Sequence, residues 1–453
     1  MFNPDQLVQT LRIWGRMPTR RLLDLLQTNR TTLMRAVRAA GPQVVGRGNA
    51  RRTSYAARRS LRGNDQTLPL FQIDQQGEAR EVARIHLIHP DGCALDFFLP
   101  FDWPMDDEMR DGWFDGLPYP LQDMRPQGYL GRQFVHAHAM LLQVGEDPQL
   151  WSDDDALHAL CLLGADQSGN YILGGPAYRL WLEQLRHPPV LLGDAELDQA
   201  YPALAQQAML QARIGSSAGG EFPKFLALRR IDDQAAHVLV KFSGSDEAPG
   251  TRRWSDLLVC EQLASEVIRT ALQIESARSV IHQAAGRTFL EVIRFDRHGL
   301  RGRSALCSWA ALNNALFGMA GRPWSDAADR LLDRGWLDAA TREAMLRIWH
   351  FGQLIGNTDM HDGNLSFLPG TPTLQLAPIY DMLPMMYAPQ RGVELSVRRF
   401  MPSLPMPGQS GAWREAARAA AEFWHRASVD PRISTPFRRI CADNAQALRG
   451  APV

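Results

Sequence analysis

The chain has few cysteines and no long uninterrupted apolar run, and these absences restrict the classes of protein it can belong to. Its five cysteines stand singly, without the paired spacing of a metal site or of a secreted disulfide framework. The first residues lack the basic and then apolar layout of a signal peptide, and proline or charge interrupts the most hydrophobic stretches. No internal repeat and no Gly-x-x-x-x-Gly-Lys-Ser/Thr phosphate loop occurs. We therefore expect a soluble, cytoplasmic protein without a membrane partner, and 453 residues suffice for two or three domains.

The formal net charge is zero, but positive charge gathers near the start of the chain. Residues 12–62 contain thirteen arginines against a single acid, Asp24. The arginines are Arg12, Arg16, Arg20, Arg21, Arg30, Arg35, Arg38, Arg47, Arg51, Arg52, Arg58, Arg59 and Arg62. A local excess of this kind is typical of segments that bind nucleic acid.

The pattern around these arginines predicts a winged helix-turn-helix domain over residues 1–63. Residues 5–14, 19–27 and 29–41 have the periodicity and end signals of three helices, and residues 44–55 resemble a basic hairpin. In such a domain the third helix enters the major groove and the wing meets phosphates. The candidate DNA contacts are Thr31, Thr32, Arg35 and Arg38 on the helix and Arg47, Arg51 and Arg52 on the wing. A basic adaptor that touches protein, or a solvated arginine-rich arm, are the alternatives.

A polar loop at residues 356–364, flanked by apolar segments, is the most informative stretch of the chain. Asp359 and Asn364 stand five positions apart, as in a kinase catalytic loop, and Asp381 follows a predicted pair of short strands. Phosphoryl transfer needs a carboxylate for the attacking hydroxyl, and hard oxygen ligands for magnesium. The alternative is that these polar residues only form turns.

Upstream segments supply the other groups that a kinase needs. Residues 236–242 form a predicted strand that carries Lys241, and residues 254–274 form a predicted helix. Glu261 or Glu266 on this helix is placed to pair with the lysine, as the corresponding glutamate does in kinases. A further predicted strand at residues 289–297 is expected to face the adenine with its backbone.

Five motifs of the chain, in their order along the sequence, resemble those of the HipA-type serine/threonine kinases, which are the toxins of bacterial type II toxin-antitoxin systems. They are Gly215-Ser-Ser-Ala-Gly-Gly-Glu-Phe-Pro-Lys224, Val240-Lys241, Arg294-Phe-Asp-Arg297, Gly356-Asn-Thr-Asp-Met-His-Asp-Gly-Asn364 and Pro378-Ile-Tyr-Asp-Met382. The resemblance covers the chain from about residue 117 onward. It implies ATP and Mg²⁺ as cofactors and transfer of phosphate to a protein serine or threonine.

The resemblance also implies roles for individual residues. Asp359 corresponds to the catalytic base, and Asn364 and Asp381 to magnesium ligands. Ser217 falls where the family carries an autophosphorylated serine, and Ser216 stands beside it. The residues expected at the nucleotide are Lys241, Glu261, Ser217, Gly219, Gly220, Phe295 and His361.

The chain departs from the family in its nucleotide loop, where residues 220–224 read Gly-Glu-Phe-Pro-Lys in place of the usual Gly-Ala-Gln-x-Lys core. It also has no eukaryotic His-Arg-Asp or Asp-Phe-Gly motif, because Thr358 precedes Asp359 and Met382 follows Asp381. Regulation through an arginine beside the base is therefore unavailable.

We therefore predict an α+β, two-lobed protein-kinase-like fold with an all-helical C-lobe, preceded by the winged helix-turn-helix domain. The expected boundaries are 1–63 for the DNA-binding domain, 64–298 for the family's N-terminal subdomain with the kinase N-lobe, and 299–453 for the C-lobe. The expected function is a toxin kinase that represses its own expression, with DNA, a protein substrate, and an antitoxin or a second copy as partners. Two alternatives remain: a DNA-binding regulator whose kinase fold senses nucleotide without transfer, and a magnesium-dependent enzyme acting on DNA.

Overall fold

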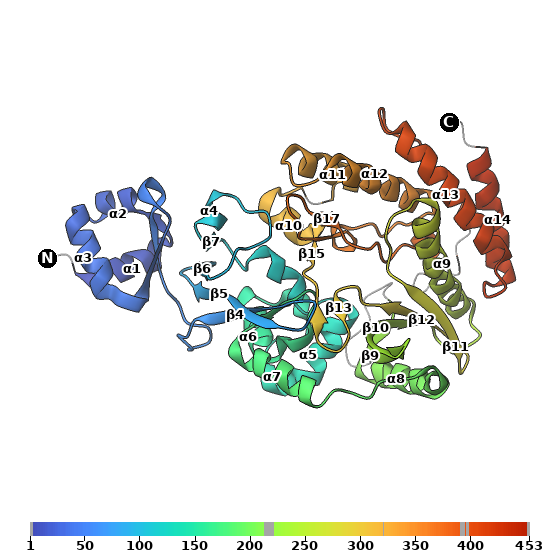
Figure 1. Ribbon diagram of the computed structural model, residues 1–453, viewed down its shortest axis with the longest axis horizontal. Helices are drawn as coiled ribbons and strands as arrows, with labels where there is room; N and C mark the ends of the chain where they lie inside the picture. The colour runs from blue at the N-terminus through green and yellow to red at the C-terminus, as the bar shows by residue number, and fades with distance from the viewer. Residues whose placement is uncertain (1–2, 213–221, 320, 390–394, 396–397, 451–453) are drawn as a thin grey trace. The chain divides into compact units, whose positions relative to one another are not determined.

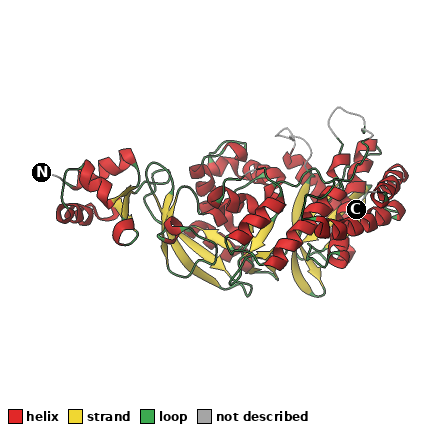
Figure 2. Ribbon diagram, turned by 90° about the horizontal axis from the view of Figure 1, so that it is seen from above, coloured by secondary structure: helices red, strands yellow, loops and turns green. Residues whose placement is uncertain are grey.

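The computed structural model describes residues 3–212, 222–319, 321–389, 395 and 398–450, and the chain divides into two compact units. Unit 1 comprises residues 1–125 and 140–187, and unit 2 comprises residues 126–139 and 188–453. Both units combine helices with strands (Figure 1, Figure 2). Among the described residues, no helix is both long and apolar enough to cross a membrane.

Unit 1 begins with three helices and a small antiparallel sheet of order β1-β3-β2. The elements are α1 (Pro4–Trp14), β1 (Met17–Pro18), α2 (Thr19–Leu25), α3 (Arg30–Ala40), β2 (Val44–Arg47) and β3 (Ser54–Ala57). Asn3 and Asn29 cap α1 and α3, because each side-chain oxygen accepts a hydrogen bond from a backbone N–H of the first turn. The three helices and the hairpin lie where the sequence predicts them, whereas β1 was not expected. It adds a third strand by pairing with β3.

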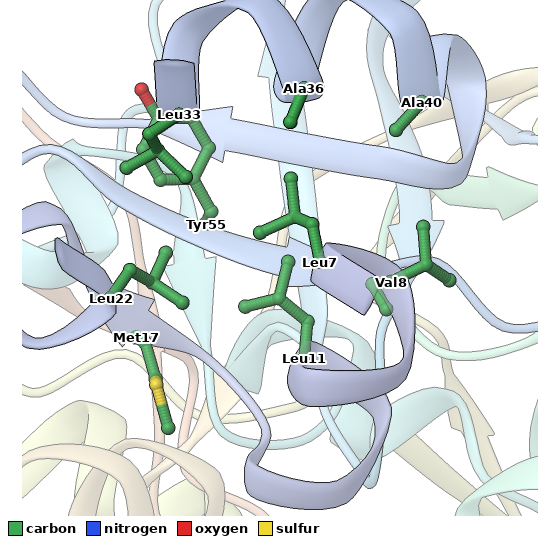
Figure 3. Close-up of a cluster of buried hydrophobic side chains, with 10 residues drawn as sticks. Leu7, Val8, Leu11, Met17, Leu22, Leu33, Ala36, Ala40 and Tyr55 are labelled. Atoms are coloured by element: carbon green, nitrogen blue, oxygen red, sulfur yellow. The ribbon is translucent and has the colours of Figure 1, made fainter. Parts of the chain in front are cut away.

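Apolar side chains from all three helices meet above this sheet and form its core (Figure 3). Leu7 and Leu11 of α1, Leu22 of α2 and Leu33 of α3 are fully buried, and their side chains point toward one another. Ala36 and Ala40 follow Leu33 at helical spacing, so α3 buries one narrow apolar face. The opposite face of α3 is left to polar residues.

The rest of unit 1 is built on a five-stranded antiparallel sheet of order β7-β6-β5-β4-β8. Its strands are β4 (Leu68–Ile73), β5 (Ala79–Leu87), β6 (Cys93–Phe97), β7 (Trp113–Phe114) and β8 (Tyr171–Leu173). The helices of this part are α4 (Asp107–Arg110), α6 (Asp153–Leu163) and α7 (Gly175–Arg186). A cluster of Val45, Ala56, Ile88, Ala94 and Trp113 joins the hairpin β2–β3 to this sheet.

Unit 2 contains a four-stranded antiparallel sheet of order β11-β12-β10-β9, with a long helix following β10. Its strands are β9 (Lys224–Ile231), β10 (Gln234–Phe242), β11 (Ser279–Ala284) and β12 (Arg287–Ile293). The helices are α8 (Leu197–Ala212) and α9 (Pro249–Ala271), and α5 (Gly128–Leu142) belongs to this unit as far as residue 139. The predicted strand at 236–242 and helix at 254–274 correspond to β10 and α9.

The C-terminal part of unit 2 is mostly helical. Its helices are α10 (Trp309–Leu316), α11 (Trp324–Asp333), α12 (Ala339–Leu354), α13 (Ser410–Val429) and α14 (Thr435–Arg449). It also contains short strands, so the prediction of an all-helical lobe is wrong in this respect. They are β15 (Cys307–Ser308), β16 (Ser366–Leu368) and β17 (Gln375–Leu376) in one sheet and the pair β13 (Arg297–His298) and β14 (Gly302–Arg303). Helix α12 ends just before the polar loop, and β16 begins two residues after it and pairs with both β15 and β17.

The core of the first three helices predicts a large difference between two leucine substitutions. Leu33→Ala removes a fully buried side chain and should cost about 2–5 kcal/mol in the free energy of unfolding of this part of the chain. Leu25→Ala is the matched control, because Leu25 is 45% exposed on the neighbouring helix. Amide hydrogen exchange of α1 and α3 measures both effects. Equal protection in the two variants would contradict the assigned core.

Candidate functional site

The polar loop at residues 356–364 is held in a defined conformation by its own side chains. The Asn357 side chain accepts a hydrogen bond from the backbone N–H of Asp359 at 3.0 Å and donates one to the carbonyl of Asp381 at 3.4 Å. The amide nitrogen of Asn364 donates to the carbonyl of Asp359 at 2.9 Å. These bonds bring Asp359, Asn364 and Asp381 to one place. The Asp359 residue is exposed there, whereas Asn364 is buried.

A tyrosine fastens the loop to the segment that carries Asp381. The Tyr380 hydroxyl donates to the carbonyl of Gly363 at 2.8 Å and lies 2.8 Å from the Ser366 hydroxyl. Asp381 itself has a φ of 55°, in the left-handed region that residues other than glycine seldom adopt. Backbone strain of this kind concentrates at functional sites, where surrounding contacts hold it in place.

Lys241 forms a buried ion pair with Glu261 at the same site. Its ammonium group donates to the two carboxylate oxygens of Glu261 at 2.7 and 2.9 Å, and also to Asp381. The pair therefore joins strand β10, helix α9 and the segment after β17. Glu266, the other candidate partner, instead lies 3.7 Å from Arg426.

Burial and the proximity of these charges change the pKa values of all three groups: those of Lys241 and Glu261 are raised and that of Asp381 is lowered. Burial by itself would lower the pKa of Lys241, but the carboxylates of Asp381 and Glu261 outweigh burial and raise it. Burial raises the pKa of Glu261, although Lys241 opposes this effect. The pKa of Asp381 is lowered, because Lys241 and Lys224 together overcome the effect of burial. The ammonium and the Asp381 carboxylate are thus both charged at neutral pH.

Lys224 belongs to the site, although its motif alone predicted no role for it. The chain contains only two lysines among 49 basic residues, Lys224 and Lys241. They lie directly opposite each other in the antiparallel register of β9 and β10, so both side chains project from the same face of the sheet. A compact ammonium differs from the planar guanidinium found at the other basic positions. The scarcity of lysine was the signal that could have identified Lys224.

The other residues expected at the nucleotide have different surroundings. The Phe295 ring lies 6.0 Å from the ring of Tyr380, which places it beside the Asp381 segment. The exposed His361 caps the short helix Asp362–Asn364 by accepting from the backbone N–H of Gly363 at 3.1 Å. Ser216, Ser217, Gly219 and Gly220 lie outside the described residues.

The residues of α3 that we expect to contact DNA differ in how exposed their side chains are. Thr31, Arg35 and Arg38 are exposed and share one side of the helix, because they are spaced four and three residues apart. Thr32 is half-buried, and its backbone N–H donates to the Asn29 cap at 2.9 Å. This face has no acidic residue, so its charge is positive.

Two of the three arginines expected on the hairpin β2–β3 are bound by acids of unit 1. Arg47 pairs with Asp96 and donates to the carbonyl of Leu95 at 3.2 Å. Arg52 donates to Asp111 at 3.1 Å and lies 3.5 Å from Asp107. Arg51 is exposed.

The same pairing extends to other arginines near the start of the chain. Arg16 lies 2.6 Å from Glu108, Arg59 lies 2.7 Å from Asp154, and Arg62 lies 2.6 Å from Asp155. Five of the thirteen arginines, Arg16, Arg47, Arg52, Arg59 and Arg62, therefore meet carboxylates located between residues 96 and 155. The acid-rich stretch at 106–115 was the sequence signal for the pairs of Arg16 and Arg52, and the three acids at 153–155 were the signal for those of Arg59 and Arg62.

Comparison with known proteins matches the chain in two segments. A family model described as the YjjJ-like toxin middle domain matches residues 64–182, and one described as the HipA-like C-terminal domain matches residues 216–448. The chain is 35% identical over 429 residues to "Toxin YjjJ" of Escherichia coli (strain K12), covering 94% of each chain. The uncovered 6% is shorter than 63 residues, so this relative shares at least part of the N-terminal segment.

Two solved structures show a weaker likeness. A chain of the toxin-antitoxin complex of HipA, HipB and operator DNA from Shewanella oneidensis MR-1 has a TM-score of 0.48 and 14% identity, covering 83% of this chain and 95% of that one. The proinflammatory kinase CtkA of Helicobacter pylori has a TM-score of 0.35 and 14% identity, covering 51% and 88%. Both scores are below 0.5, so the assignment rests on the sequence matches. By those matches, the chain belongs to the family of HipA-like toxins.

Proposed function

We propose that this chain is an ATP-dependent serine/threonine protein kinase that acts as a toxin. The observation that carries the proposal is the meeting of Lys241, Glu261 and Asp381 at the loop that presents Asp359 and Asn364. These are the groups that kinases use, in the same chain order. Turn-forming residues alone would not require a lysine and a glutamate to be buried together beside the loop.

In this proposal each residue of the site has a separate role in phosphoryl transfer. The exposed Asp359 accepts the proton of a substrate serine or threonine hydroxyl, whose oxygen forms a bond to the γ-phosphorus of ATP. The bond from that phosphorus to the β–γ bridging oxygen breaks, and ADP leaves with its electron pair. Lys241, oriented by Glu261, contacts the phosphates, and Lys224 adds a second positive charge on the same sheet face.

The residues present fit a magnesium ion. Asn364 commits its amide nitrogen to the carbonyl of Asp359, which leaves its amide oxygen as the group for a cation. Asp381 is charged and its side chain is 34% exposed, so it can exchange Lys241 for a metal. An ion held by one or two protein oxygens and by phosphates is the usual arrangement for magnesium. When bound, it would neutralise charge on the triphosphate.

Substitutions in the loop should separate chemistry from nucleotide binding. Asp359→Asn keeps the shape of the side chain but removes the anionic acceptor, so transfer of labelled phosphate should fall by about 10²–10⁴-fold while ATP still binds. Asp381→Ala should instead weaken binding of Mg-ATP. Asp362→Asn is the matched control, because Asp362 lies in the same loop but is held by the Asn313 amide at 3.0 Å. Wild-type transfer by both Asp359→Asn and Asp381→Ala would refute the kinase assignment.

The same assay distinguishes the remaining alternatives. A nucleotide sensor would bind ATP without transferring phosphate, and a magnesium-dependent enzyme acting on DNA would change plasmid DNA without ATP. The intact set of Asp359, Asn364, Asp381 and Lys241 favours transfer over sensing.

We also propose that residues 1–63 form a winged helix-turn-helix that binds DNA and allows the chain to regulate its own expression. The helix order, the antiparallel hairpin and the exposed basic face of α3 support this reading. The internal pairing of Arg47 and Arg52 weakens their candidacy as phosphate contacts, and it supports a docking role for the hairpin. A helix face that binds another protein, such as an antitoxin or a second copy, is the alternative.

Point substitutions test the DNA assignment more sharply than deletion, since removing residues 1–63 would uncover the buried Ile88 and Trp113. Arg35→Ala and Arg38→Ala should each weaken DNA retention, and each should reduce the slope of log K against log salt by about 0.9 if the arginine neutralises one phosphate. Arg52→Ala is the matched control, because Asp111 and Asp107 already bind this arginine. Gel shifts over a salt series measure both. DNA retention that is independent of salt, or equal losses in all three variants, would contradict the proposal.

Autophosphorylation at Ser217 or Ser216 remains a prediction that follows from the family resemblance. A phosphate there would add nearly two negative charges seven or eight residues before Lys224 in the chain, so we expect it to lower nucleotide affinity. Mass spectrometry after incubation with ATP should find phosphate at one of these serines in the wild type and none in Asp359→Asn. Phosphate found only elsewhere, or a Ser217→Asp chain with unchanged ATP affinity, would exclude this mode of regulation.

A further inference from the structure

Helix α9 determines where Glu261 lies, and this helix is attached along its length to the C-terminal helices. It follows strand β10 and carries Glu261 toward Lys241. On Figure 1 it lies beside α13 and α14, and its residues contact α13. The attachment consists of three sets of contacts, each made by a side chain within eight residues of Glu261.

The first contact joins α9 to the start of α14. The Asp256 carboxylate accepts hydrogen bonds from both the backbone N–H and the hydroxyl of Ser434, each at 2.6 Å. Asp256 is only 2% exposed. Ser434 is the cap residue of α14, so one buried carboxylate fixes the distance between the two helices. Loss of these bonds would leave a buried polar group without partners, which is costly.

The second contact lies one helical turn earlier. The Arg253 guanidinium stacks 4.1 Å from the centre of the Phe437 ring on α14 and lies 3.8 Å from Asp256. It also donates to the carbonyl of Tyr387 at 3.3 Å. Tyr387 follows Asp381 by six residues, so Arg253 connects α9 to both α14 and the segment that carries the proposed metal ligand.

The third contact is made by the residue next to Glu261. The Gln262 side-chain oxygen accepts from Arg432 at 2.7 Å, and Asp430 holds the same arginine at 2.6 and 3.0 Å. Residues 261 and 262 therefore point in different directions, one to Lys241 and the other to the connection between α13 and α14. Rotation of α9 about its axis would break one contact or the other.

We infer that Asp256 and Arg253 are positioning residues, which hold α9 in the orientation where Glu261 meets Lys241. The fold thus forms the lysine–glutamate pair without a separate activating event. The absence of an arginine beside Asp359 agrees with this, since a phosphorylated segment has no such residue to bind. The inference rests on the proposed kinase function for its catalytic consequence, but not for its geometry.

A double-mutant cycle tests whether Asp256 acts through Glu261. Asp256→Ala should lower kcat/KM for phosphate transfer about tenfold in the otherwise wild-type chain but less than about threefold in a Glu261→Gln chain, because residues that act as one unit are not additive. A merely structural role would reduce activity equally in both backgrounds, and this outcome would overturn the inference. Ser428→Ala is the matched control, because its hydroxyl donates within α13, to the carbonyl of His425 at 2.7 Å, and not to α9.

A second measurement is independent of catalysis and uses the scarcity of lysine. An amine-reactive acylating reagent can label only Lys224, Lys241 and the N-terminus, so mass spectrometry resolves each site. Lys241 is buried against Glu261 and should label slowly. Asp256→Ala and Glu261→Gln should both raise its labelling several-fold, while Ser428→Ala should not.

Failure of the phosphate-transfer assay and failure of the labelling experiment would have different meanings. If the wild type transfers no phosphate, the proposed function fails, and the labelling still decides the positioning role. If Asp256→Ala does not fold, Ser434→Ala removes one of the two donors to the carboxylate and should show the same effects at lower amplitude. Unchanged labelling of Lys241 in folded variants would overturn the inference.

Discussion

The buried pair of Lys241 and Glu261 is the constraint on which the site of unit 2 depends. Removing two charges from water costs several kcal/mol per ion, and only short, well-directed contacts compensate for that cost. The lysine meets both oxygens of one carboxylate and also approaches a second carboxylate, that of Asp381. The register of β10, the orientation of α9 and the left-handed conformation at Asp381 must all be correct for these contacts to form.

Such a pair is more informative about function than about stability. An apolar pair of similar size would often be as stable in the same position, so a buried ion pair is weak support for a structural role. Here the lysine stands opposite the only other lysine of the chain, in a protein that otherwise uses arginine. Two lysines on one sheet face, close to an exposed aspartate, support the proposal that this site binds and transfers a phosphate group.

The N-terminal arginines have two different environments: some are exposed to solvent and others form ion pairs within unit 1. Arg35 and Arg38 face outward from α3, whereas Arg47 and Arg52 contact carboxylates elsewhere in unit 1. Most of these ion pairs are partly exposed, so each contributes little to stability. Together with the apolar cluster around Trp113, they attach the hairpin β2–β3 to the five-stranded sheet. The basic surface left for a partner is therefore smaller than the arginine count indicates.

The sequence by itself determined the order of the elements, the family resemblance and the identity of most candidate site residues, because these depend on local periodicity, end signals and short motifs. Helix α3 begins after Asn29 and the loop of Asp359 follows α12, as such signals predict. Only the tertiary structure decided that Glu261 rather than Glu266 meets the lysine, that Lys224 shares its face, and that Arg47 and Arg52 are occupied. Each of these facts depends on contacts between residues far apart in the chain, and local patterns carry no information about which distant charge will lie within bonding distance.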